Sequence, residues 1–152
     1  MSLPFGQVVR SVLAVLGGIV VLTVTSFAIE AAADPILMWM FPHALPNRAA
    51  ISHNLPSALF LLAYTSLCVA AGGYVAAWLA RRYPVWHALA MGVVQEGLTL
   101  WAMSSLANEA PLRNWIATLV LTIPVAWCGG LVRARQSRKN RAPEKRVQGP
   151  TA

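Results

Sequence analysis

The sequence predicts an all-α, polytopic membrane protein, and three observations lead to this fold class. Of the 152 residues, 57% are hydrophobic and 11% are charged, whereas a soluble domain carries roughly 25% charged residues. Long apolar stretches alternate with short polar or proline-containing connections. Basic side chains lie at the ends of these stretches and are almost absent within them. Together these features predict a four-transmembrane-helix bundle over residues 1–132 and a separate tail over residues 133–152.

The first predicted span covers residues 11–30, and it follows Arg10. Its first part, residues 11–29, carries no charge. A secretory signal is the alternative interpretation, because small residues suited to cleavage follow the apolar run at residues 31–33. The run exceeds the roughly 7–15 apolar residues of a signal peptide, so a retained span is favoured.

The connection over residues 34–54 contains an apolar segment that is too short to cross a bilayer. This segment, residues 36–41, includes Trp39, and an aromatic side chain of this kind favours a position at the lipid headgroups. Asn47 is placed to cap a helical turn that leads into the second span, and Pro56 suits the first turn of that span.

The second predicted span, residues 55–80, is the helix around which we expect the others to pack. Helices in lipid associate where small residues let their backbones approach closely. Small residues form two stripes on this span, one of Ser66, Ala70, Gly73 and Ala77 and the other of Gly72, Ala76 and Ala80.

The third and fourth predicted spans are residues 85–106 and 112–132, and Pro124 is expected to bend the fourth. The following residues 133–152 are polar, contain proline and glycine, and lack aromatic side chains. Such a segment buries too little apolar surface to order itself, so a disordered cytoplasmic tail is predicted.

Charge placement predicts the orientation of the bundle. With four spans, both termini lie on one side, together with all of the 12 lysines and arginines except Arg48 and Arg113. The positive-inside rule places that side in the cytoplasm, as for a bacterial inner-membrane protein. The tryptophans all fall near predicted span ends, where aromatic belts form.

The basic tail favours contact with anionic lipid headgroups over contact with nucleic acid. A nucleic-acid-binding domain spreads its basic residues over a folded face, whereas here they follow an apolar stretch directly. Each basic side chain near an anionic surface contributes about 1 kcal/mol. The residues expected to contact lipid are Arg133, Arg135, Arg138, Lys139 and Arg141.

The polar pair Gln95 and Glu96 lies at the middle of the third predicted span. An acidic side chain at this depth costs roughly 2.5–3.5 kcal/mol on insertion scales. One face of the helix combines small and polar residues at helical spacing, namely Ala88, Gly92, Gln95, Thr99 and Ala102. The favoured interpretation is polar contact between helices, and the alternative is a proton or cation site in a small transporter or channel. Hydroxyl partners expected at similar depth are Thr23, Ser66, Thr99 and Thr122.

A second polar line, formed by Thr23, Ser26, Glu30 and Asp34, follows the first span at helical spacing. It has the form of an entry path from the outer surface, with Thr23 and Glu30 as further candidate ligands. The simpler interpretation is that hydroxyls bond their own backbone carbonyls and that Glu30 is hydrated near the interface.

No local motif indicates a catalytic, cofactor or metal site. His43 and His53 are separated by loop residues, without the spacing of metal ligands. Cys68 and Cys128 fall at different depths, which predicts two reduced thiols. We therefore expect no metal and no cofactor, and a membrane-embedded enzyme is the third functional hypothesis.

Residues 72–81, GGYVAAWLAR, and residues 87–92, HALAMG, resemble a pattern of small uncharacterised four-span bacterial inner-membrane proteins. The two runs make up about a tenth of the 152 residues, and the resemblance implies the four-span fold without assigning an activity. Small multidrug-resistance carriers also have four spans and a membrane glutamate, but theirs lies in the first span of a shorter chain. The leading hypothesis is thus a non-enzymatic structural or accessory bundle, with a homo-oligomer or a larger membrane complex as its setting.

Overall fold

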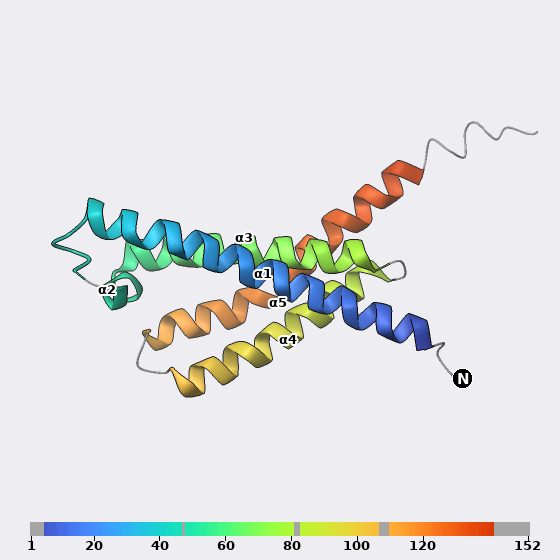
Figure 1. Cartoon of the computed structure of the whole chain (residues 1–152), viewed down its shortest axis with the longest axis horizontal. Coiled ribbons are helices and arrows are strands. Elements are labelled where there is room, and N and C mark those ends of the chain that lie inside the picture. The colour runs from blue at the N-terminus through green and yellow to red at the C-terminus, as the bar shows by residue number, and fades with distance from the viewer. Residues whose placement is uncertain (1–4, 47, 81–82, 107–109, 142–152) are drawn as a thin grey trace, which may run out of the picture.

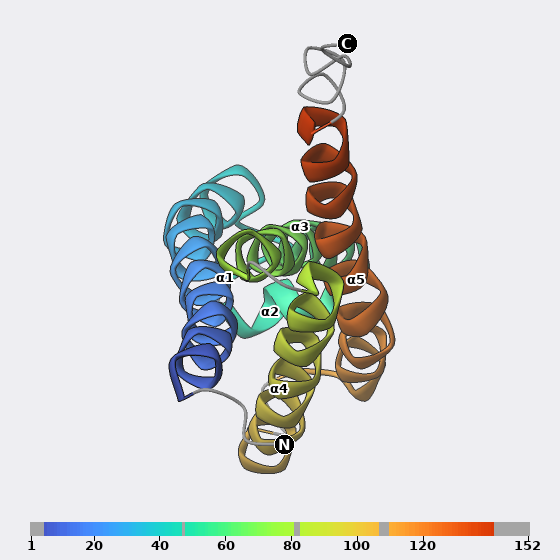
Figure 2. The same cartoon turned by 90° about the vertical axis from the view of Figure 1, so that its right-hand side faces the viewer.

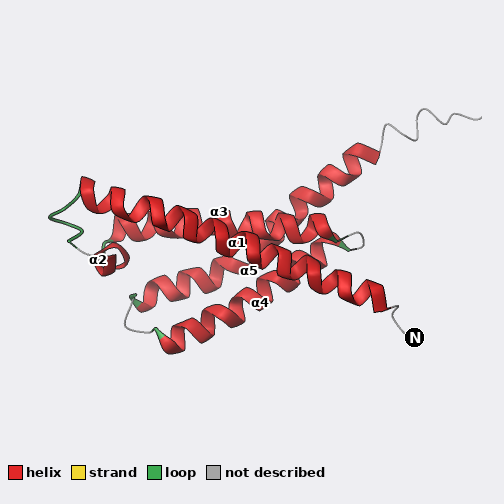
Figure 3. Ribbon diagram, viewed as in Figure 1, coloured by secondary structure: helices red, strands yellow, loops and turns green. Residues whose placement is uncertain are grey.

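The computed structural model describes residues 5–46, 48–80, 83–106 and 110–141. This part of the chain consists of helices and loops and contains no strand (Figure 3). The helices are α1 (Phe5–Met40), α2 (Arg48–His53), α3 (Leu55–Leu79), α4 (Pro84–Ser105) and α5 (Leu112–Arg141). The predicted all-α class is therefore confirmed.

Helix α3 lies at the centre of the fold, as expected from its small residues. It contacts each of the other helices, and an end-on view shows it between α1 and α5 (Figure 2). The long helices alternate in direction, so the N-terminal end of α1 and the C-terminal end of α3 lie at the same end of the bundle (Figure 1).

The two predicted stripes of α3 pack against different helices. On one stripe, a Cβ placed on Gly72 would lie 2.7 Å from the carbonyl oxygen of Gly18 in α1. On the other, a Cβ placed on Gly73 would lie 2.5 Å from the carbonyl oxygen of Ala126 in α5. Both distances are shorter than van der Waals contact, so these two positions require glycine for the backbones to approach.

Small residues fill the interior, and large apolar residues face outward. The best-buried side chains include Ala76, Ala88 and Ala126. Leu67 and Phe27, by contrast, are 71% and 66% exposed. A soluble protein buries its large apolar side chains first, so this distribution is the one expected of helices surrounded by lipid.

Local sequence explains where the central helices begin. The side chain of Asn54 accepts a hydrogen bond from the backbone N–H of Ser57. Pro56 occupies the first turn of α3, and this position was predicted. Tyr83 precedes α4 with a φ of 54°, which turns the chain sharply, and Pro84 then starts the helix.

The predicted number of spans is confirmed only in part. Three helices are long and apolar enough to cross a membrane, covering Gly6–Met40, Leu55–Leu79 and Leu112–Lys139. The third predicted span is present as helix α4, with 22 residues, but α4 is not among the three helices that are apolar enough to cross a membrane. The polar side chains of His87, Gln95 and Glu96 lower its apolar character.

Helix α1 also differs from its prediction. It extends past residue 30 and through Pro35 to Met40, so residues 36–40 are helical and belong to α1 instead of forming a separate segment. A proline inside a helix removes the hydrogen bond of its own nitrogen and crowds the carbonyl one turn earlier, but the alanines before it favour helix. The predicted turn before α3 is confirmed as α2, whereas its predicted cap, Asn47, lies outside the described residues.

Helix α5 corrects the predicted start of the disordered tail. The helix continues past Val132 to Arg141, because Arg, Ala, Gln and Lys are strong helix formers. The hydroxyl of Tyr74 donates a 2.8 Å hydrogen bond to Oε1 of Gln136, which ties the extension to α3. Residues 142–152 lie outside the described residues. Figure 2 shows that α5 changes direction along its length, which we attribute to Pro124 inside it.

Candidate functional site

The Glu96 region of α4 faces the helix bundle without forming a complete polar site. The side chain is partly buried, and its Oε1 atom is buried with no hydrogen-bond partner among the described residues. The predicted small and polar face is confirmed as a packing face, since Ala88 and Thr99 are buried. A Cβ placed on Gly92 would lie 3.2 Å from the Cβ of Ala126 in α5.

Three of the four hydroxyl groups predicted as partners for Glu96 donate elsewhere. Thr99 Oγ1 donates to the carbonyl oxygen of Gln95 at 2.9 Å. Thr122 Oγ1 donates to the carbonyl oxygen of Thr118 at 2.8 Å. Ser66 Oγ donates to the carbonyl oxygen of Leu62 at 2.7 Å. Each of these hydroxyl protons is used by its own helix, as is usual for Ser and Thr in membrane helices.

The polar line on α1 is divided by the structure. Thr23 is exposed, whereas Ser26, Glu30 and Asp34 are partly buried. The hydroxyl of Tyr64 in α3 lies near the carboxylates of Glu30 and Asp34, without meeting strict hydrogen-bond geometry. Glu30 thus faces a neighbouring helix, and Thr23 does not belong to the same environment.

Tyr64 was missed by sequence reasoning, although it is 6% exposed and borders the acidic pair. The signal that points to it is a phenol inside a long, uncharged helix, next to the hydroxyl residues Thr65 and Ser66. A buried phenol needs a polar neighbour, and the carboxylates of α1 are the groups at matching depth.

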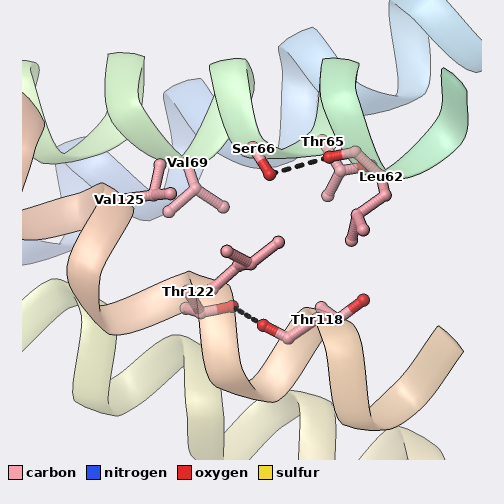
Figure 4. Close-up of a pocket in the computed structure, with 8 residues that line it drawn as sticks. Leu62, Thr65, Ser66, Val69, Thr118, Thr122 and Val125 are labelled. Carbon is pink, nitrogen blue, oxygen red and sulfur yellow. Dashed lines mark hydrogen bonds between the residues drawn. The ribbon is translucent and has the colours of Figure 1, made fainter. Parts of the chain in front are cut away.

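A small cavity lies between α3 and α5 (Figure 4). Its volume is about 10 Å³, which is close to the space needed for one water molecule. Hydroxyl groups from both helices line it, namely Thr65, Ser66, Thr118 and Thr122, beside the apolar Leu62, Val69, Leu121 and Val125.

Two larger grooves open on the surface of the bundle. One, of about 240 Å³, lies between the first turns of α3 and α5 and has Arg113 and Asn114 at its end. The other, of about 450 Å³, lies between α1 and α4 and is almost entirely apolar, with Trp86 and His87 among its lining residues. Neither groove is lined by Glu96.

Metal and thiol chemistry receive no support from the described side chains. Within the described ranges, no group of three or more His, Cys, Asp or Glu side chains is placed to hold a metal ion. Cys68 and Cys128 are both free, the first buried and the second exposed. His43 and His53 are exposed.

Comparisons of the chain with protein-family models, curated proteins and solved structures find no match.

Proposed function

We propose that the chain is an integral membrane protein with four crossings, acting as a non-enzymatic structural or accessory bundle. The observation that carries this proposal is the reversed distribution of apolar side chains. Alanine and glycine occupy much of the interior, with a few larger side chains such as Met91, and Leu67, Phe27 and other large apolar side chains cover the outside. Such an extended apolar surface is unfavourable in water, whereas its exposure to hydrocarbon costs nothing.

Continuity of the chain supports a crossing by α4. Arg113 Nη2, at the start of α5, donates to the carbonyl oxygen of His53 at 2.8 Å. The neighbouring Asn114 Nδ2 donates to the carbonyl oxygen of Ser52 at 2.8 Å. Since α3 and α5 therefore begin at the same end, α4 must return the chain across the thickness of the bundle (Figure 1). Its 22 residues extend about 33 Å, enough for the roughly 30 Å hydrocarbon core.

The side proposed for both termini is the cytoplasm of a bacterial cell, because most basic residues gather there. Arg135, Arg138 and Lys139 are exposed on the extension of α5, and we propose that they contact anionic headgroups of the inner leaflet. A helical extension supports this contact, because it presents these side chains at a fixed spacing.

The four-crossing arrangement predicts the sides of the two connections that border α4. In a variant whose native cysteines are replaced, Tyr83→Cys and Ala110→Cys should react from opposite faces of the membrane. The measurement is labelling by a membrane-impermeant maleimide in intact and permeabilised cells. Labelling of both positions from one face would mean that α4 does not cross.

A structural role is supported by the close packing of the helices. Backbones meet at Gly72 and Gly73, and the hydroxyl protons of Ser66 and Thr122 are used within their own helices. A transporter needs helices that separate and polar groups that face a passage, and these contacts oppose both.

A small transporter or channel using Glu96, Gln95 and Thr99 is the second candidate function. The observation that favours it is the buried Oε1 atom of Glu96, which lacks a hydrogen-bond partner in the described part of the chain. A carboxyl group in this state is suited to take up a proton or cation.

Proton flux distinguishes these two functions. Vesicles that contain the purified protein should hold an imposed pH gradient for as long as protein-free vesicles do, as measured with an enclosed pH-sensitive dye. Dissipation that is faster and that disappears in Glu96→Gln would establish transport and contradict the structural proposal.

A further inference from the structure

The groove between the first turns of α3 and α5 combines a polar end with apolar walls. Arg113 and Asn114 lie at its end, beside the hydrogen bonds that join α5 to the backbone of His53 and Ser52. The walls are formed by Leu55, Ala58, Leu59, Leu61, Leu62 and Ala117, together with Thr65 and Thr118.

The polar end is suited to an anion. An arginine carries five N–H donors and a permanent positive charge, and one of its nitrogens here, Nη2, binds the carbonyl oxygen of His53. Arg113 is exposed, so its remaining donors can reach a phosphate. The described residues that line the groove include no acidic side chain.

The apolar part of the groove excludes a polar ligand. The hydroxyl of Thr65 donates to the carbonyl oxygen of Leu61 at 2.8 Å, and that of Thr118 donates to the carbonyl oxygen of Asn114 at 3.0 Å. With both protons used, the walls offer hydrocarbon contact and no donor, so a hydrocarbon chain is the group that fits.

The dimensions of the groove match one leaflet of a bilayer. Leu55 and Thr65 are ten positions apart in the sequence, which corresponds to about 15 Å along a helix. This length is half of a roughly 30 Å hydrocarbon core. The groove volume of about 240 Å³ is well above the roughly 10–15 Å³ that one water molecule needs.

We propose that this groove holds one anionic glycerophospholipid of the outer leaflet. Its phosphate binds Arg113 and Asn114, and one acyl chain lies between α3 and α5 beside Leu59 and Leu62. The inference rests on the proposed membrane function, because the groove faces lipid only if both helices cross the bilayer. The bound lipid would fill the gap that the two helices leave between their first turns.

Lipid retention tests this site. The full chain is reconstituted in nanodiscs of mixed phosphatidylglycerol and phosphatidylcholine, released into mild detergent and examined by native mass spectrometry. We expect one phosphatidylglycerol molecule to remain per chain. Arg113→Gln should weaken this retention about tenfold, in line with the loss of one charge-assisted hydrogen bond, and Arg113→Lys should weaken it less.

A second pair of variants tests the groove without changing the charge. Ala117→Phe fills the groove and should abolish retention, whereas Ile116→Phe, at an exposed neighbouring position outside the lining, should retain the lipid. Equal retention by wild type, Arg113→Gln and Ala117→Phe would overturn the proposal, as would equal retention of phosphatidylcholine.

Failure of the lipid site and failure of the membrane proposal are distinguishable. If the cysteine labelling places Tyr83 and Ala110 on opposite faces but no lipid is retained, only the lipid site is wrong. If the wild-type chain does not partition into membranes, the membrane proposal itself fails.

Discussion

Replacing Gly73 by alanine is expected to destabilise the bundle by roughly 1–3 kcal/mol, the range typical of overpacking. The added Cβ would lie 2.5 Å from the carbonyl oxygen of Ala126 and 3.1 Å from its Cα. Because the obstacle is backbone, no side-chain rotation can relieve it, and α3 and α5 must move apart. The measurement is the unfolding midpoint in mixed detergent and sodium dodecyl sulfate, followed by circular dichroism.

Gly97→Ala is the matched control for this substitution. Gly97 lies inside α4, and a Cβ placed there meets nothing within 4 Å. Alanine is the better helix former by about 1 kcal/mol in water, so this variant should be as stable as wild type or more stable. Equal loss of stability in the two variants would show that the close contact at Gly73 does not hold the bundle together.

Replacing Glu96 by leucine is expected to stabilise the bundle by roughly 1–3 kcal/mol, the cost of a buried polar atom that makes no hydrogen bond. The Oε1 atom of Glu96 is buried and makes no hydrogen bond to a described group. Leucine removes this unsatisfied atom and keeps a side chain of similar length. The same unfolding midpoint measures the gain.

Glu30→Leu provides the contrast. The carboxylate of Glu30 lies near the hydroxyl of Tyr64 and interacts with it electrostatically, so its loss should give no gain and leave the phenol without its neighbour. A loss of stability in Glu96→Leu, comparable to that in Glu30→Leu, would mean that Glu96 takes part in a contact between helices.

The two acidic groups illustrate what local sequence can and cannot predict. Spacing along one helix correctly placed Gly92 and Thr99 on a packing face, because the period of a helix determines which residues share a side. It did not reveal that Glu30 faces Tyr64, because that depends on the relative rotation and depth of two separate helices. Helical spacing also placed Thr23, Ser26, Glu30 and Asp34 on one face of the first span. Spacing does not show which part of that face a neighbouring helix covers, and Thr23 lies on an exposed part of α1.

The ends of the helices were likewise predictable from the sequence only in part. The start of α3 was predicted with Pro56 in its first turn, whereas its cap, Asn54, was found only in the structure. The ends of α1 and α5 were not predicted, since Pro35 lies inside a helix and a charged sequence such as residues 133–141 forms helix readily but also occurs in disordered tails. Hydrogen bonding of Tyr74 to Gln136 is the tertiary contact that accompanies the longer α5.

The amino-acid sequence by itself determined the all-α class, the approximate position of each long helix and the small-residue stripes of α3. These properties follow from composition and from periodicity within one segment. The packing of the helices sets which helix each stripe contacts, leaves one oxygen of Glu96 without a partner among the described residues, and brings Arg113 and Asn114 to the last turn of α2 beside an apolar groove. The physical reason is that such relations depend on how far two helices slide and rotate against each other, and this depends on where glycines such as Gly72 and Gly73 let their backbones touch.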